Sequence, residues 1–450
     1  MAERLPDALH GPGARGRHAA HRASRSPRAG VGHSSARLRD RVLDRCRRAA
    51  VLGPVLLTTF QVVLAYLRLR APSSIVLPNG NISLSFQGPL SARLGYSDLY
   101  TEYALHGLFH HPWPYVNVPI EYPVLTGVYM TAAAALTHGV RAYFLLSSVG
   151  LLACALGSVL VLWSISRRAA WWLSACPLVF VYTLLNWDFF AIFLMLLGWR
   201  AYRRERYAWA GIWLAAGACA KAFPALFLLY GLVELARRAR RGETSRRSAR
   251  AMGTSALLVV VVVNVPFMVL NMSSWLEFWR FNAERHGHAG LLYRLGILSH
   301  VSVGTADDVL LGLVGLIGIA GAFVIWRRAP DLTRVAAVAF AAFLAVEKVY
   351  SPQYTLWLFV FALLAQWEAW TLVLLTAGGL YDYVNSAIII NLTANHSPAF
   401  YWYHRRVFPL GEELRLSAIL VGTAGTTAQA WWRRRRATAD GNDAPVAFES

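Results

Sequence analysis

The sequence predicts an all-α membrane protein, a polytopic bundle of roughly ten to thirteen transmembrane helices, several of them short and broken. Composition favours this fold class, because 56% of the 450 residues are hydrophobic, only 15% are charged, and the mean hydropathy is +0.41;. Apolar stretches recur along most of the chain, and several are long enough to cross a bilayer of about 30 Å. Arginines gather between these stretches, as they do in the cytoplasmic loops of membrane proteins.

The predicted elements follow from these apolar stretches. An arginine-rich segment, 1–48, has too little apolar surface to form a core and is expected to be a disordered cytoplasmic tail;. The membrane domain is expected over 49–436 and a second cytoplasmic tail over 437–450. The first span is expected at 50–67;. The later spans are expected at 123–137, 142–165, 169–185, 189–200, 208–220, 223–236, 252–271, 308–326, 334–346, 354–366, 370–391 and 415–432.

Charge patterning gives the expected topology. Both termini are predicted to be cytoplasmic in the plasma membrane, which requires an even number of crossings, so one stretch within 123–165 is expected to be partly re-entrant. Segment 169–200 is then a hairpin that turns at Asn186-Trp187-Asp188, and 208–236 breaks at Lys221-Ala222-Phe223-Pro224. Both turns are expected on the outer side. The net charge of +20 follows from this topology, and no nucleic-acid partner is expected;.

The first extracytoplasmic loop, 69–122, holds the densest group of candidate functional residues. Asp98 and Glu121 flank an aromatic segment that leads into the next span. A carboxylate held among aromatic rings at a membrane surface is partly desolvated, which raises its pKa and suits a general base. The alternative is that Asp98 only caps a surface helix beside an interfacial aromatic belt.

Six different short motifs follow one another along the chain. They are Tyr96-Ser97-Asp98, Pro114-Tyr115, Glu121-Tyr122-Pro123, Asn186-Trp187-Asp188, Ala210-Gly211 with Lys221-Ala222-Phe223-Pro224, and Lys348-Val349-Tyr350-Ser351-Pro352-Gln353-Tyr354. Their order and spacing, over most of residues 50–432, resemble glycosyltransferase family 87. Those GT-C enzymes are similar to the actinobacterial polyprenol-phosphate-mannose-dependent α-mannosyltransferases.

The resemblance implies a GT-C-like fold and an enzyme that moves a hexose, expected to be mannose, from a polyprenyl phosphate donor without a further cofactor. The acceptor is expected to be a lipid-linked or envelope glycan on the extracytoplasmic face, and membrane lipid is the other expected partner. Position for position, the family's catalytic aspartate corresponds to Asp98. Two other classes remain open: a transporter or flippase of lipid-linked sugars, and a non-catalytic membrane scaffold.

Candidate substrate-binding residues are of two kinds. Cations near the departing phosphate would stabilise the charge that develops there, and the candidates are Lys221, Arg280, Arg285, His286 and Lys348. Aromatic and polar side chains would contact the sugar, and the candidates are Tyr96, Glu102, Tyr115, Glu121, Tyr122, Asp188, Gln353 and Tyr354. In the alternative interpretation the arginines pair with Glu277 and Glu284, and the lysines anchor helix ends.

Two further classes of site are not expected. No carboxylates have a spacing typical of Mg²⁺ or Mn²⁺ ligands, so no metal is predicted;. No glycine-rich phosphate loop is present, which argues against a nucleotide donor;.

Overall fold

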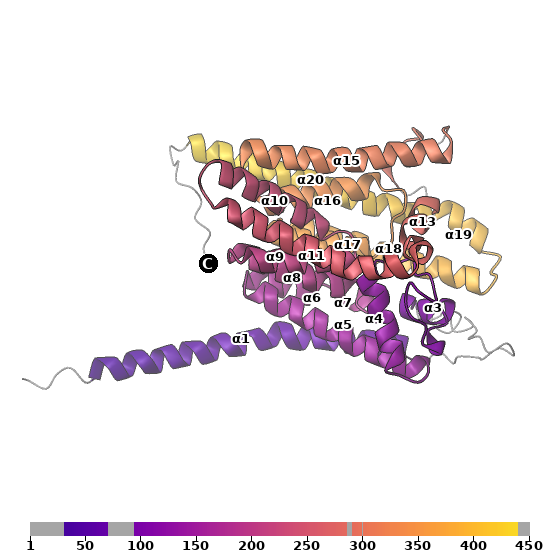
Figure 1. Cartoon of the computed structure of the whole chain (residues 1–450), viewed down its shortest axis with the longest axis horizontal. Helices are drawn as coiled ribbons and strands as arrows, with labels where there is room; N and C mark the ends of the chain where they lie inside the picture. The colour runs from indigo at the N-terminus through magenta and orange to yellow at the C-terminus, as the bar shows by residue number, and fades with distance from the viewer. Residues whose placement is uncertain (1–30, 71–93, 286–289, 299, 440–450) are drawn as a thin grey trace, which may run out of the picture. The chain divides into compact units, whose positions relative to one another are not determined.

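The computed structural model describes residues 31–70, 94–285, 290–298 and 300–439, and within these ranges it contains helices and no strand (Figure 1). A single isolated β-bridge joins Pro114 and Val118. The chain divides into two units, 1–50 and 51–450, and the candidate site lies within the second. The predicted all-α polytopic class is confirmed.

The helices of the second unit follow the expected apolar stretches closely. They are α3 (Asp98–Leu105), η1 (Leu108–His110), α4 (Val124–Ala135), α5 (Val140–Trp163), α6 (Arg167–Ala175), α7 (Leu178–Tyr182), α8 (Asp188–Arg203), α9 (Tyr207–Ala220), α10 (Ala225–Arg240), α11 (Arg246–Leu270), α12 (Met272–Trp275), α13 (Glu277–Glu284), α14 (Leu291–Arg294), α15 (Val303–Arg328), α16 (Leu332–Val346), α17 (Tyr354–Leu364), α18 (Ala369–Ala394), α19 (Phe400–Arg406) and α20 (Phe408–Ala439).

Helix α1 (Val31–Leu69) starts earlier than the sequence suggested. It begins within the segment 1–48 that was expected to be disordered, and residues 1–30 lie outside the described residues. Alanine, leucine and arginine between 36 and 50 are strong helix formers, so nothing interrupts the helix ahead of the apolar stretch;.

Five helices are long and apolar enough to cross a membrane. These segments are Ala50–Leu69, Val140–Trp163, Arg246–Leu270, Val303–Arg328 and Ala369–Thr393, and four shorter apolar helices accompany them. Only 6% of the apolar window of α11 and 17% of that of α15 are buried inside the protein, so both present apolar surface outward, as contact with lipid requires;. The number of spans, ten to thirteen, stays a prediction.

Segment 169–185 forms two short helices, in keeping with the short, broken helices that the sequence predicted. Helix α6 ends at Ala175 and α7 begins at Leu178, after Pro177. Proline lacks the backbone N–H and clashes with the preceding turn, so the helix breaks there. The two predicted turns are confirmed: Asn186-Trp187 lies between α7 and α8, and Lys221 to Pro224 lies between α9 and α10.

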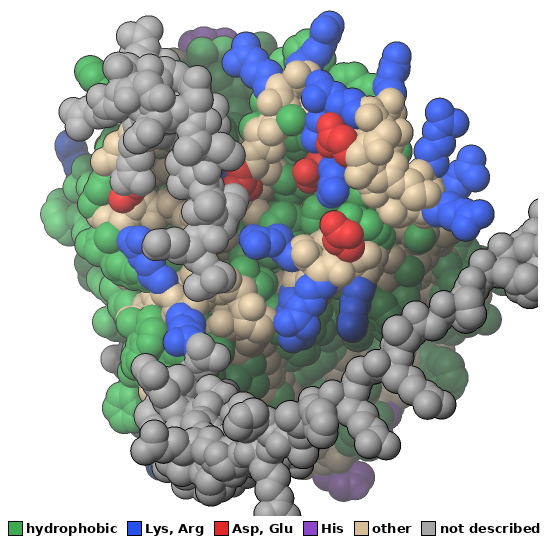
Figure 2. All heavy atoms as spheres, turned by 90° about the vertical axis from the view of Figure 1, so that its left-hand side faces the viewer, with side chains coloured by type: hydrophobic (Ala, Val, Ile, Leu, Met, Phe, Trp, Pro, Cys, Tyr) green, Lys and Arg blue, Asp and Glu red, His purple; other side chains and the backbone are tan. Residues whose placement is uncertain are grey.

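The two ends of the helical bundle differ in charge. Exposed arginines gather on one face at the ends of α8, α10 and α15 and at the start of α11 (Figure 2). Helices α3 and α13, which contribute to the candidate site, lie at the opposite end of the bundle (Figure 1). The basic face and the candidate site therefore lie on opposite sides.

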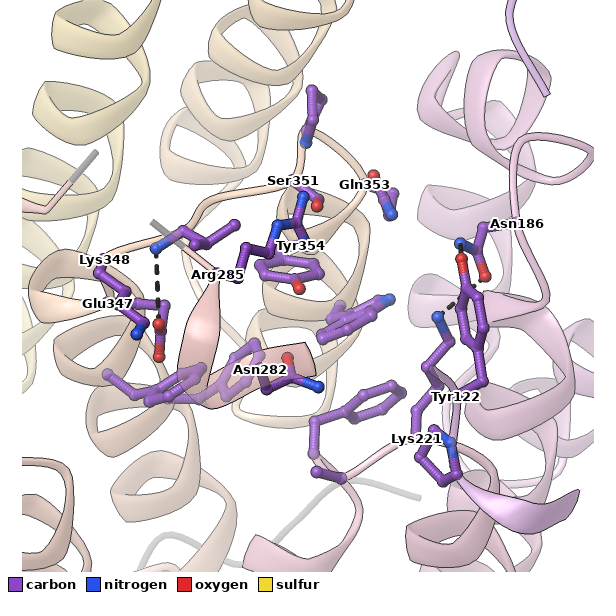
Figure 3. Close-up of a pocket in the computed structure, with 18 of the residues that line it drawn as sticks. Tyr122, Asn186, Lys221, Asn282, Arg285, Glu347, Lys348, Ser351, Gln353 and Tyr354 are labelled. Carbon is purple, nitrogen blue, oxygen red and sulfur yellow. Dashed lines mark hydrogen bonds between the residues drawn. The ribbon is translucent and has the colours of Figure 1, made fainter. Parts of the chain in front are cut away.

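Helix α17 occupies the centre of the bundle. Its residues from Thr355 to Leu363 are all buried, and Phe361 stacks on Phe340 of α16 with the ring centroids 4.6 Å apart. A helix that is apolar on all sides is stable only when neighbouring elements surround it. Tyr354, the first residue of α17, faces the candidate site (Figure 3) and stacks on Trp357 at 4.2 Å.

Candidate functional site

A cavity of about 1040 Å³ opens among the described helices. One wall comes from α3, the start of α4 and the two turns that precede α8 and α10. The other wall comes from α13, α15, α16, α17 and α18. Polar side chains gather where the two walls face each other, and apolar side chains of α10, α15 and α16 line the rest of the cavity.

Asp98 lies in the first wall as the first residue of α3. Two hydrogen bonds fix this end of α3 to the turn before α8. The Ser97 hydroxyl donates to the carbonyl of Leu184 at 2.5 Å, and the backbone N–H of Asp98 donates to the carbonyl of Leu185 at 2.8 Å. The loop that carries Asp98 is thereby held against the membrane bundle, with its carboxylate on the cavity.

A chain of hydrogen bonds orients the Asp98 carboxylate, and Figure 3 shows the Tyr122, Asn186 and Lys221 members of this chain. Asn186 donates from Nδ2 to Asp98 Oδ2 at 2.5 Å, and Lys221 donates from Nζ to Asn186 Oδ1 at 2.9 Å. The Tyr122 hydroxyl lies 3.5 Å from the same carboxylate oxygen and accepts a 2.9 Å bond from Asn186. Asp98 is therefore held in one orientation by residues from three separate segments.

Burial raises the pKa of Asp98, and hydrogen bonds from Tyr96 and Asn186 and the charge of Lys221 offset part of that rise. A carboxylate with a raised pKa is a stronger base than an ordinary aspartate, while the donors around it keep the charged form accessible. This combination suits the removal of a proton from a hydroxyl.

Asp188 stands behind the first wall. Its side chain is fully buried, does not line the cavity, and lies 3.7 Å from Lys221 Nζ. The sequence placed Asp188 among the substrate contacts, but its position as the first residue of α8 turns it towards the bundle. It balances the charge of Lys221 instead.

Tyr115, like Asp188, supports the first wall from outside the cavity. It is buried outside the cavity, and its hydroxyl donates to the carbonyls of Tyr122 at 2.9 Å and Pro123 at 3.0 Å. The ring lies directly against Gly127, where a Cβ would fall 2.2 Å from the Tyr115 oxygen. Tyr115 therefore fixes the backbone that carries Tyr122 and does not itself line the cavity.

Cations and polar groups form the facing wall (Figure 3). Arg285 follows α13 and lines the cavity close enough to act electrostatically on Asp98 and Tyr354. Lys348 also lines the cavity, but its ammonium donates to the carbonyl of Ala283 at 3.0 Å and pairs with Asp307 at 2.9 Å. Within the described part of the chain no carboxylate pairs with Arg285, so its charge is the more available one.

Of the remaining predicted residues, most line the cavity and one does not. Several line the cavity as expected: Tyr96, Glu102, Glu121, Tyr122, Lys221, Gln353 and Tyr354. Arg280 does not, because it projects from the outer side of α13, where it is half-exposed and 3.9 Å from Glu277. His286 lies outside the described residues. The structure adds Asn186, Asn282 and Trp357, which the sequence did not single out as contacts.

The structure therefore defines an all-helical membrane protein with a carboxylate that faces cations across a partly apolar cavity. The chain belongs to glycosyltransferase family 87, whose model matches residues 120–352, slightly more than half of it. The protein is therefore a membrane glycosyltransferase. The match includes Asn186, Lys221, Arg285 and Lys348 and begins after Asp98. Comparison with the curated proteins gives no match.

Proposed function

We propose that the protein transfers a hexose, mannose, from a polyprenyl phosphate to a lipid-linked or envelope glycan on the extracytoplasmic face of the plasma membrane. The observation that carries the proposal is that one cavity joins a base, two cations and an apolar groove. A polyprenyl phosphate sugar has one part for each of these features: an anomeric carbon that an acceptor hydroxyl attacks, an anionic phosphate and an apolar chain.

The apolar part of the cavity supports a prenyl-linked donor. Leu226 and Leu229 of α10 face residues 314–319 of α15 across it, and Phe343 of α16 adds a third side. Gly315 and Gly318 have no atoms within 4 Å of the positions that a Cβ would occupy. Bare backbone therefore borders the groove at these two positions, which leaves room there for a hydrocarbon chain.

The polar part supports glycosyl transfer. The acceptor hydroxyl gives its proton to Asp98 as its oxygen bonds to the anomeric carbon, and the bond from that carbon to the phosphate oxygen breaks. The departing phosphate gains negative charge, which Arg285 and Lys348 stabilise from the facing wall;. Asn186 and Lys221 hold Asp98 in position, and the rings of Tyr122, Tyr354 and Trp357 offer apolar faces to the sugar.

The charge distribution supports the assigned side of the membrane. The arginine-rich face (Figure 2) corresponds to the cytoplasmic side under the positive-inside rule;. Helices α3 and α13, which contribute to the cavity, lie at the opposite end of the bundle (Figure 1).

The groove gives a prediction about donor chain length. Gly315→Leu is expected to raise the KM for a long-chain polyprenyl donor about tenfold, since overfilling an apolar site costs about 1–3 kcal/mol. Initial rates with donors of increasing prenyl length measure the effect. Gly304→Leu, in the first turn of α15 and away from the cavity, is the matched control and should keep the wild-type KM. An unchanged KM in Gly315→Leu would place the chain elsewhere.

The hydrogen bond from Asn186 gives a prediction about pH. Asn186→Ala removes a donor that lowers the pKa of Asp98, so the pKa rises further and the acidic limb of kcat/KM moves to higher pH. Asn282→Ala, on the facing wall, should leave that limb in place. The measurement is kcat/KM across the acidic range for both variants. A limb that stays in place in Asn186→Ala, or moves to lower pH, would exclude Asp98 as the titrating base.

The reaction itself is tested in proteoliposomes. Purified protein should form a hexosylated product from polyprenyl phosphate mannose and none from a nucleotide sugar. A transporter or flippase would move labelled lipid-linked sugar across the vesicle without forming a new glycosidic bond. A scaffold would leave the donor unchanged, and either outcome would overturn the proposal.

A further inference from the structure

A cluster of three potential metal ligands lies in the wall of the cavity, next to Asp98. Glu102 is on α3, His106 caps its C-terminal end four residues later, and Glu121 precedes α4. His106 Nε2 lies 2.9 Å from Oε2 of Glu102 and 2.8 Å from Oε2 of Glu121. The three ligand atoms all lie within 4.8 Å of one another, and both carboxylates line the cavity.

Two of these three atoms lack a well-formed hydrogen bond among the described residues, although His106 lies at ion-pair distance from both carboxylates. His106 Nε2 and Glu102 Oε2 are buried, and neither has a hydrogen bond of acceptable geometry. Glu102 is only 5% exposed. Buried polar atoms in folded proteins almost always have a partner, and one ring nitrogen carries at most one proton for two carboxylates. A shared cation would satisfy all three atoms at once.

The spacing fits octahedral coordination. Ligands at about 2.1 Å from an ion, at right angles to each other, are about 3.0 Å apart. The two measured separations, 2.8 and 2.9 Å, are close to this value. The third pair of ligand atoms, on Glu102 and Glu121, lies within 4.8 Å.

The charge and chemistry of the cluster also favour a cation. Asp98 adds a third carboxylate within electrostatic range of Glu102, while the nearby ammonium of Lys221 lies beside Asp188. One imidazole and two carboxylates form a mixed nitrogen and oxygen set, which suits borderline divalent ions such as Mn²⁺ and Zn²⁺ better than a thiolate-binding ion.

We propose that Glu102, His106 and Glu121 bind a divalent transition-metal ion, Mn²⁺ or Zn²⁺, in the wall of the cavity. Glu102 and Glu121 were predicted as contacts of the substrate and not of a metal, because their spacing along the chain is not typical of metal ligands. Binding of the ion does not depend on the proposed transfer reaction.

The test is direct metal binding to the purified full-length protein. After treatment with EDTA and its removal, the protein is titrated with Mn²⁺, and bound ion is followed by loss of the electron paramagnetic resonance signal of free Mn²⁺. The wild type is expected to bind one ion per chain, and its thermal midpoint should rise with Mn²⁺, as it does for any ligand specific to the folded state. Competition with Zn²⁺ and Ca²⁺ then ranks the ions.

Variants assign the site. His106→Gln and Glu121→Gln are expected to weaken Mn²⁺ binding by at least about tenfold, with unchanged gel filtration and an unchanged thermal midpoint in EDTA. His110→Gln replaces a neighbouring, exposed histidine and should bind as the wild type does. If His106→Gln does not fold, the more exposed Glu121 still provides the test.

Two results would overturn the proposal. One is a wild-type protein that binds no Mn²⁺ or Zn²⁺ at millimolar concentration, which would leave a protonated His106 shared between the two carboxylates. In that state the burial of His106 disfavours its charge, but Glu102 and Glu121 outweigh this and raise its pKa to about 9. The other is equal affinity in His106→Gln, Glu121→Gln and the wild type, which would place the ion elsewhere.

Discussion

Asp98→Asn is expected to lower the rate of hexose transfer by about 10²- to 10⁴-fold, the usual contribution of a positioned general base. Asparagine has the same shape, and its oxygen can still accept the bond that Asn186 donates at 2.5 Å. The side chain therefore stays in place and loses only its ability to take a proton. Turnover of purified, reconstituted protein measures the effect.

The matched control for this variant is Asp308→Asn. Asp308 is exposed in the first turns of α15, away from the cavity. It should keep wild-type turnover, and both variants should accumulate in the membrane at the wild-type level. Asp98→Asn with full activity would show that another group removes the proton.

Arg285→Ala is expected to lower kcat by about 10²- to 10³-fold, the range found when one preorganised donor to a developing negative charge is removed. Its charge faces the cavity without a carboxylate partner in the described parts of the chain, so it is available to the departing phosphate. Lys348→Met should have a smaller effect, because its ammonium is shared with Asp307 at 2.9 Å. Single-turnover rates separate this loss from weaker donor binding.

Arg280→Ala provides the control on the same short helix. Arg280 is half-exposed on the outer side of α13, beside Glu277, and does not line the cavity. Equal losses in Arg280→Ala and Arg285→Ala would mean that general charge on α13, rather than a contact with the phosphate, supports the reaction.

Much of the fold could be predicted from the sequence, because a bilayer imposes long apolar stretches and a charge asymmetry between loops. The exceptions are local. Pro177 breaks one predicted span into α6 and α7, and α1 extends backwards to Val31 because no residue stops it. The apolar content of a segment does not by itself predict where a proline breaks a helix or where a helix begins.

The candidate site could be predicted only in part. Asp98 stood out as a carboxylate in an aromatic loop, but whether Tyr115, Asp188 or Arg280 faced the cavity depended on tertiary packing. Arg280 and Arg285 are five residues apart, and only the end of α13 directs Arg285 to the cavity while Arg280 points outward. Asn186 was visible as part of a turn, yet its bond to Asp98 joins segments 88 residues apart.

One measurement tests hexose transfer by way of Asp98 most directly. It is mass spectrometry of envelope glycolipids and polysaccharides from cells that lack the protein, complemented with the wild type or with Asp98→Asn at equal membrane levels. We expect a glycan one hexose short, restored by the wild type and not by Asp98→Asn. An unchanged glycan in the deleted cells, or full restoration by Asp98→Asn, would contradict the account.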